Sequence, residues 1–125
     1  MLFLMLVICV LSCGCGPETI WTAEARSPDG TSIATAKRLR YSGPGNAGLY
    51  TYVYLKRTIY SNPAEVIASF DQDNVLQADA ARLDLMMKWI TPTALDITYD
   101  GHAGTLYLQV AKYAGIDITV HQSPD

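Results

Sequence analysis

The chain has 125 residues, of which half are hydrophobic and 17% are charged, and its formal net charge is −3. This composition excludes an intrinsically disordered chain and a strongly basic nucleic-acid-binding protein, and the length suits one compact domain. The apolar residues are unevenly distributed, because residues 1–12 include eleven apolar side chains and no charged one. The first twelve residues therefore differ sharply in composition from the domain that follows.

The first apolar run, Met1–Leu11, is too short to span a bilayer, which takes about 20 helical residues. Its length is typical of the apolar region of an export signal. The small residues that follow it, in the segment 12–17, end a helix and offer an extended site to a peptidase. The sequence therefore predicts a signal peptide over 1–12, a tether over 13–19 and a single domain over 20–125.

The end of this run, Val10-Leu11-Ser12-Cys13, resembles the lipobox of bacterial lipoproteins, with an aliphatic residue at −3 and a small one at −1. The resemblance implies a diacylglyceryl group on the Cys13 thiol and a membrane anchor formed by that lipid. Cys15, which follows Gly14, is the alternative acceptor. The implied location is the bacterial cell envelope, facing the periplasm from the outer membrane in a Gram-negative host, since Asp does not follow Cys13.

The cysteines offer no other chemistry. No cysteine follows Cys15, so the domain over 20–125 forms no internal disulfide. Cys13 and Cys15 are separated by one residue and lack the further ligands that a zinc site needs. We expect no metal and no cofactor other than the covalent lipid.

Alternation of apolar and polar residues dominates the rest of the chain and is typical of β-strands. The predicted strands are Ile20–Arg26, Ile33–Tyr41, Leu49–Thr58, Ala64–Phe70, Leu83–Ile90, Leu95–Tyr99, Thr105–Lys112 and Ile116–Val120. A tight turn is predicted at Ser27–Gly30, a hairpin turn at Asp100–Gly104 and one short helix near 74–82. The expected fold is mainly β, an antiparallel sandwich or partly open barrel of about seven or eight short strands.

The hairpin around Ser27-Pro28-Asp29-Gly30, with Trp21 before it, is similar to one strand-turn-strand unit of TolB-type β-propellers. A propeller needs at least four blades of about 40 residues, which this chain is too short to form. The overall pattern also resembles small β-rich bacterial lipoproteins, a resemblance that implies no activity.

A candidate binding face follows from pairing Tyr41 with Leu49 across the glycine-rich segment 42–48. This register places two cations beside three phenol rings on a solvent-facing surface: Arg38, Arg40, Tyr50, Tyr52 and Tyr54. Ile33, Leu39 and the β-branched residues between the tyrosines then form the core face. Exposed Tyr and Arg are enriched at interfaces, and the alternative is an ordinary half-exposed sheet.

Charge supports the binding interpretation, because segment 18–60 holds six basic and three acidic residues and segment 61–125 three basic and nine acidic. A basic hairpin near a lipid anchor suits anionic headgroups or glycan phosphates, and the expected partners are an envelope protein or a glycan. We expect no nucleic-acid partner.

Enzymatic function is not expected. The sequence contains two histidines, His102 and His121, and no Gly-x-Ser-x-Gly motif. Asp96 and Asp117 alternate with aliphatic residues and are expected to face outward. The sequence thus predicts a non-catalytic, lipid-anchored binding or structural domain. The alternatives are a soluble periplasmic domain using the same face and, in a different class, a small hydrolase using His102 with Asp100 or Asp117.

Overall fold

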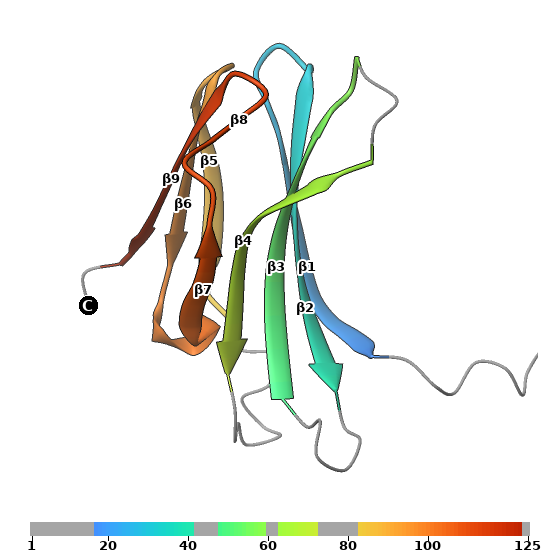
Figure 1. Cartoon of the computed structure of the whole chain (residues 1–125), viewed down its shortest axis with the longest axis vertical. Coiled ribbons are helices and arrows are strands. Elements are labelled where there is room, and N and C mark those ends of the chain that lie inside the picture. Colours follow the sequence, from blue (N-terminus) through green and yellow to red (C-terminus); the bar gives the residue numbers. More distant parts are fainter. Residues whose placement is uncertain (1–16, 42–47, 60–62, 73–82, 124–125) are drawn as a thin grey trace, which may run out of the picture.

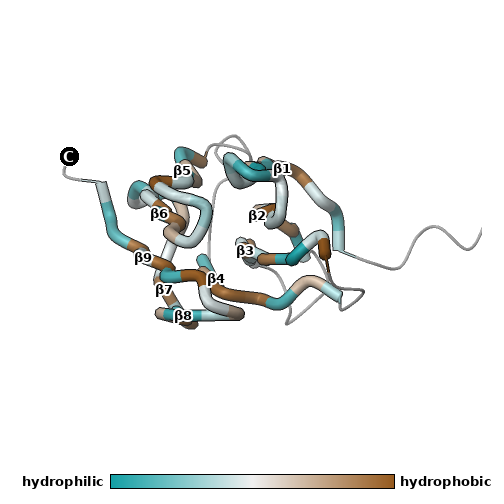
Figure 2. Tube along the Cα trace, turned by 90° about the horizontal axis from the view of Figure 1, so that it is seen from above, coloured by the Kyte–Doolittle hydropathy of each residue, from teal (hydrophilic) through white to brown (hydrophobic). Residues whose placement is uncertain are grey.

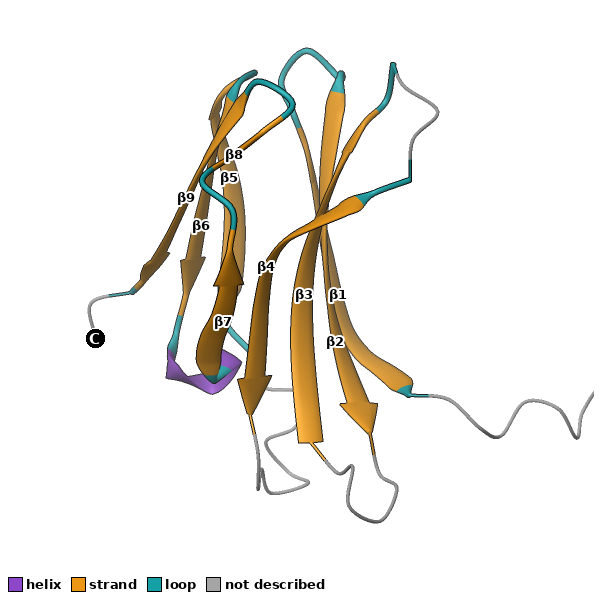
Figure 3. Cartoon of the chain, viewed as in Figure 1, coloured by secondary structure: helices purple, strands orange, loops and turns teal. Residues whose placement is uncertain are grey.

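The computed structural model describes residues 17–41, 48–59, 63–72 and 83–123, which form two sheets packed face to face (Figure 1). The predicted signal peptide, Cys13, Cys15 and the predicted short helix near 74–82 lie outside these residues. In the described part of the chain the strands are β1 (Glu18–Arg26), β2 (Ser32–Tyr41), β3 (Gly48–Arg57), β4 (Glu65–Gln72), β5 (Leu85–Thr91), β6 (Ala94–Tyr99), β7 (Thr105–Gln109), β8 (Lys112–Tyr113) and β9 (Ile116–Gln122). Strand dominates and the only described helix is one short 3₁₀ turn (Figure 3). The prediction of a mainly β sandwich is confirmed.

Five strands form one sheet in the order β1-β2-β3-β4-β7, and four form the other in the order β5-β6-β9-β8. All pairs are antiparallel except β6 and β9, which run parallel. The expected all-antiparallel arrangement is wrong at that pair, because the chain between β6 and β9 crosses to the first sheet and back. β1 begins at Glu18, two residues before the predicted strand.

The crossover involves two corrections to the predicted elements. Residues 100–104 form no hairpin turn: they hold the 3₁₀ helix η2 (Gly101–Ala103), which connects β6 of one sheet to β7 of the other. The predicted strand Thr105–Lys112 is divided, because the chain changes partner at its end. The Val110 N–H donates to the Ile67 carbonyl, and the Ile118 N–H donates to the Ala111 carbonyl. One continuous segment thereby closes one side of the sandwich (Figure 2).

The register between β2 and β3 differs by one residue from the prediction. Tyr41 lies opposite Gly48, and Arg38 lies opposite Thr51. Since side chains alternate between faces, this shift reverses β2 relative to β3. Ala34, Ala36 and Arg38 face the core with Val53 and Leu55. The predicted grouping of Ile33 and Leu39 with the core face is therefore wrong.

Four small residues explain this choice of face. Ala23 pairs with Ala36, and Ala25 pairs with Ala34, so an alanine patch covers the inner surface of β1 and β2. The patch leaves room for large side chains from the second sheet, among them Trp89 of β5. The Trp89 indole N–H donates to the Ala25 carbonyl at 3.0 Å, which joins the two sheets on the side opposite to the crossover. Large residues on one sheet thus complement small ones on the other.

Gly104, which follows η2, lies against the end of β4. Its φ of +95° is in a region that residues with a Cβ rarely adopt, and a Cβ built there would lie 2.3 Å from the Asp71 carbonyl oxygen. Gly30, in the turn between β1 and β2, also has a positive φ, of +74°, but no atom lies within 4 Å of the position of its Cβ. A side chain at Gly30 would therefore cause backbone strain alone, whereas a side chain at Gly104 would cause both backbone strain and a steric clash.

We predict that Gly104→Ala lowers the free energy of unfolding by about 3 kcal/mol or more, since strain and the clash with Asp71 add. Gly30→Ala serves as the matched control and costs about 1–2 kcal/mol from strain alone. Urea unfolding of both variants measures the difference. Equal losses would mean that η2 does not pack against β4 as described.

Candidate functional site

The outer surface of the five-stranded sheet carries a tyrosine face, which we define as Tyr41, Tyr50, Tyr52, Tyr54 and Tyr107. Three of these alternate along β3 with the buried residues Thr51, Val53 and Leu55, so the strand's period of two places their rings away from the core. Tyr107 of β7 is 81% exposed. The prediction that Tyr50, Tyr52 and Tyr54 share one partly exposed face agrees with this arrangement.

The rings of this face contact one another in a row. The Tyr41 and Tyr50 centroids are 5.1 Å apart with an interplanar angle of 90°. Tyr50 and Tyr52 are nearly parallel at 6.5 Å, and Tyr52 and Tyr54 are 6.2 Å apart. Burial, together with the charges of the neighbouring tyrosines and Asp71, raises the pKa of Tyr52 above its ordinary value. The rings from Tyr41 to Tyr54 therefore form one continuous aromatic surface, on which the raised pKa favours the neutral form of the Tyr52 phenol.

Two depressions flank this row. A hollow of about 350 Å³ is lined by Tyr50, Tyr52, Ser69, Phe70, Asp71 and Tyr107. An open groove of about 450 Å³ lies beside Tyr54 and is lined by Glu24, Ile33, Thr35, Lys37, Tyr54, Lys56 and Ala64. Because the row of rings along β3 runs from the hollow to the groove, the two depressions form one elongated surface.

Arg38 and Arg40 do not belong to this face, which corrects the predicted stripe of guanidinium and phenol groups. The one-residue shift in register directs both arginines to the inner face of β2. Arg38 is fully buried, whereas Arg40 forms an ion pair with Glu18 of β1. The cations beside the rings are instead Lys37, which lies opposite Tyr52, and Lys56, which follows Tyr54 on β3.

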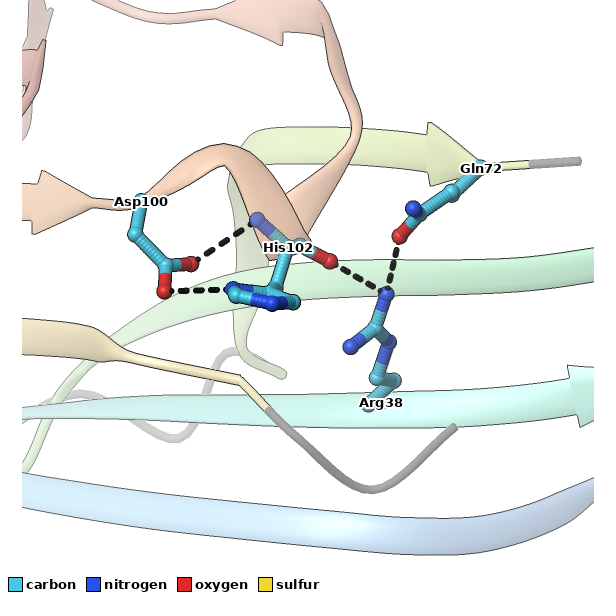
Figure 4. A network of polar contacts seen from close by, with 4 residues as sticks. All are labelled: Arg38, Gln72, Asp100 and His102. Carbon is cyan, nitrogen blue, oxygen red and sulfur yellow. Dashed lines mark hydrogen bonds and ion pairs between the residues drawn. The ribbon is translucent and has the colours of Figure 1, made fainter. Parts of the chain in front are cut away.

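The buried Arg38 guanidinium connects three elements at one end of the sandwich (Figure 4). Its Nη2 donates to Oε1 of Gln72 at 2.7 Å and to the His102 carbonyl at 2.6 Å. Asp100 accepts hydrogen bonds from the His102 main-chain N–H at 3.0 Å and from the ring Nδ1 at 2.8 Å, which caps η2. The cluster therefore ties β2, β4 and η2 together.

The combined effects of burial and neighbouring groups lower the pKa values of both Arg38 and Asp100. Burial lowers the pKa of the Arg38 guanidinium, and the Asp100 charge opposes that effect. Burial alone acts to raise the pKa of Asp100, but the hydrogen bonds and charge of His102 outweigh it, so this pKa lies below its ordinary value. The ionised carboxylate is thus the form that the folded chain stabilises.

His121 lacks the geometry of a nucleophile-activating base, whereas the contact of the His102 Nδ1 with Asp100 matches the carboxylate half of that geometry. Such a base uses one ring nitrogen toward the nucleophile and the other toward its orienting carboxylate. His121 uses the same Nε2 for Asp96, at 2.9 Å, and for the Thr98 hydroxyl, at 3.3 Å. Asp117 forms an ion pair with Lys112 and contributes nothing to His102. Asp100 and His102 do pair, and their bonds cap a turn.

The described residues also bear on metal coordination and on membrane-spanning helices. Across residues 17–41, 48–59, 63–72 and 83–123, no group of three or more His, Cys, Asp or Glu side chains is placed to hold a metal ion. Within the same ranges, no helix has the length and apolar character needed to cross a bilayer. The two cysteines of the lipobox-like segment are not among these residues.

Comparison with protein-family models, with curated proteins and with solved structures gives no significant match.

Sequence reasoning missed Tyr41, Ser69, Asp71 and Tyr107 as members of the outer surface. Ser69 and Asp71 join it because β4 pairs with β3, opposite Tyr52 and Tyr50 respectively. Tyr107 joins it because β7 pairs with β4. Only the alternation of leucine with Thr, Tyr and Gln in 105–109 could have suggested an outward Tyr107, and no local pattern indicates which strands are neighbours.

We predict that Arg38→Ala lowers the free energy of unfolding by about 3–5 kcal/mol, because it leaves Gln72 and the His102 carbonyl without their buried donor. Lys37→Ala, one residue away on the exposed face, is the matched control and changes stability by no more than about 0.5 kcal/mol. Chemical denaturation of the two variants measures both. A loss for Arg38→Ala as small as that for Lys37→Ala would contradict the buried cluster.

A second prediction concerns pH. Because the folded-state pKa of Asp100 is lowered, its stabilising contribution is complete above the unfolded pKa of about 3.9 and is lost as pH falls through the folded value. Asp100→Asn should therefore reduce stability by about 1 kcal/mol at neutral pH, and the difference from the unaltered chain should narrow below about pH 4. Urea unfolding across this pH range measures the gap. A gap independent of pH would show that the carboxylate charge has no part in capping η2.

Proposed function

We propose that this protein is a non-catalytic binding domain of the bacterial cell envelope, held at the membrane by a lipid on Cys13. Its binding surface is the tyrosine face of the five-stranded sheet. The observation that carries the proposal is the continuous row of partly exposed rings from Tyr41 to Tyr54. Tyr is enriched where interfaces concentrate their binding energy, since it offers a large rigid surface and a polar tip.

The contacts that the histidines form with aspartates support a binding function rather than a catalytic one. The Asp100–His102 pair caps η2, which in turn supplies the carbonyl that Arg38 needs. The His121–Asp96 pair lies on the outer surface of the other sheet, where both carboxylate oxygens of Asp96 contact the His121 Nε2. These contacts account for both histidines in structural terms.

The anchor is supported by the apolar run and by the small residue before Cys13. Five residue steps separate Cys13 from Glu18, where β1 begins, and they reach at most about 17 Å. A lipid on Cys13 would therefore hold the sandwich close to the membrane surface. Stable anchoring of this kind takes more than one acyl chain, which a diacylglyceryl group provides.

We predict that the full chain, expressed in a bacterial host, incorporates radiolabelled palmitate and fractionates with membranes. Cys13→Ala should abolish both properties, because the lipid is the anchor. Cys15→Ala, two residues away, is the matched control and should leave both unchanged. Equal labelling of the double variant Cys13→Ala, Cys15→Ala, or recovery of the unaltered chain in the soluble periplasmic fraction, would refute the anchor. Loss of label only in Cys15→Ala would place the lipid on Cys15 instead of Cys13.

A further inference from the structure

The polar groups of the tyrosine face are available to a ligand. Among the described residues, no intramolecular hydrogen bond engages the hydroxyls of Tyr50, Tyr52, Tyr54 or Tyr107, and neither a hydrogen bond nor an ion pair engages the Asp71 carboxylate. The side chains of this surface therefore keep their donors and acceptors for solvent or for a bound molecule. A ligand that matches them has to offer several hydroxyl-like groups in return.

The composition of the hollow narrows the class of that ligand. Its lining consists of four aromatic residues, one serine and one aspartate, and it includes neither an aliphatic side chain nor a cation. The Asp71 carboxylate repels phosphate and other anionic groups and accepts hydrogen bonds from neutral hydroxyls. Charge complementarity therefore disfavours the anionic headgroups expected from the sequence, and the lack of aliphatic groups disfavours the insertion of an apolar peptide side chain.

A pyranose sugar has the complementary chemistry. Its two faces carry C–H groups, which pack against the negative faces of aromatic rings, and its rim carries hydroxyls that both donate and accept hydrogen bonds. The row holds four rings, whose successive centroids are 5.1, 6.5 and 6.2 Å apart, and therefore offers more aromatic surface than one isolated sugar can cover. The groove beyond Tyr54 adds the exposed ammonium groups of Lys37 and Lys56 as donors to sugar oxygens.

We infer that the tyrosine face binds a linear chain of uncharged pyranose sugars, which lies along β3 from the hollow at Asp71 to the groove at Lys56. This inference rests on the proposed function and adds the chemical class of the ligand. Tyr50 and Tyr52 stack on sugar faces, and Tyr107 covers the hollow from the neighbouring β7. Asp71 and Ser69 accept and donate hydrogen bonds at the rim.

The test uses the full-length protein purified in detergent. Chitohexaose, cellohexaose and the corresponding disaccharides are titrated while intrinsic fluorescence is followed, and cosedimentation with protein-free cell-wall sacculi is measured. A hexasaccharide should bind at least about tenfold more tightly than its disaccharide, because only the longer chain covers both depressions. Tyr52→Ala should weaken binding about tenfold, whereas Tyr52→Phe, which keeps the ring, should retain most of it.

Two further variants control for folding and position. Tyr107→Ala removes a ring that is 81% exposed and should weaken glycan binding without lowering the melting temperature. Met86→Ala removes a large side chain that is 64% exposed on the other sheet and should leave binding unchanged. Glycan binding that survives Tyr52→Ala and Tyr107→Ala overturns the inference.

A parallel measurement separates the ligand class from the proposed function. The same variants are cosedimented with a detergent-washed envelope fraction that retains its proteins. If the hexasaccharides and the sacculi all fail to bind while Tyr52→Ala loses the envelope fraction, the glycan inference is overturned and the binding face stands, with a protein as its partner. If no variant of the tyrosine face alters binding to any of these materials, the inference and the proposed function both fail.

Discussion

Arg38 is the largest fully buried side chain of the described core, and the position of its guanidinium constrains much of the fold around it. A buried charge costs several kcal/mol unless its donors are satisfied. Gln72 and the His102 carbonyl supply acceptors, so the end of β4 and the η2 crossover have to meet β2 at this point. Asp100 holds η2 in the conformation that presents the carbonyl.

The orientation of β2 that buries Arg38 also determines which side chains lie beside the tyrosine face. Because β2 directs Arg38 and the alanine patch inward, Lys37 and Leu39 point outward beside the rings of β3. The sandwich thus has one face devoted to packing and another that exposes aromatic rings with unused hydroxyls. An exposed aromatic surface of this kind is typical of interaction sites.

Sequence patterns located the strands well, because alternation of apolar and polar residues depends on each segment alone. All eight predicted strand ranges overlap strands of the structure, and the turn at 27–30 forms with the Asp29 carboxylate accepting from the hydroxyls of Ser27 and Thr31. The errors concern relations between segments. Alternating side chains define two faces of β2, and the face with the larger residues Ile33 and Leu39 is expected to be buried. The structure buries the opposite face. Likewise, nothing local to 105–112 indicates that this stretch pairs with β4 at one end and β9 at the other.

By itself, the sequence determined the β class, the approximate strand ranges and the alternation that gathers Tyr50, Tyr52 and Tyr54 on one side of a strand. Only the tertiary structure decided the register that buries Arg38 and the parallel pairing of β6 with β9. It also brought Asp71 and Tyr107 beside Tyr50 and Tyr52, where together they line the hollow. The reason is physical: alternation is a property of one strand, whereas burial depends on which volume the opposite sheet leaves unfilled. Here the Trp89 indole N–H donates to the Ala25 carbonyl beside the paired alanines, and Ala34 and Ala36, not Ile33 and Leu39, face the core.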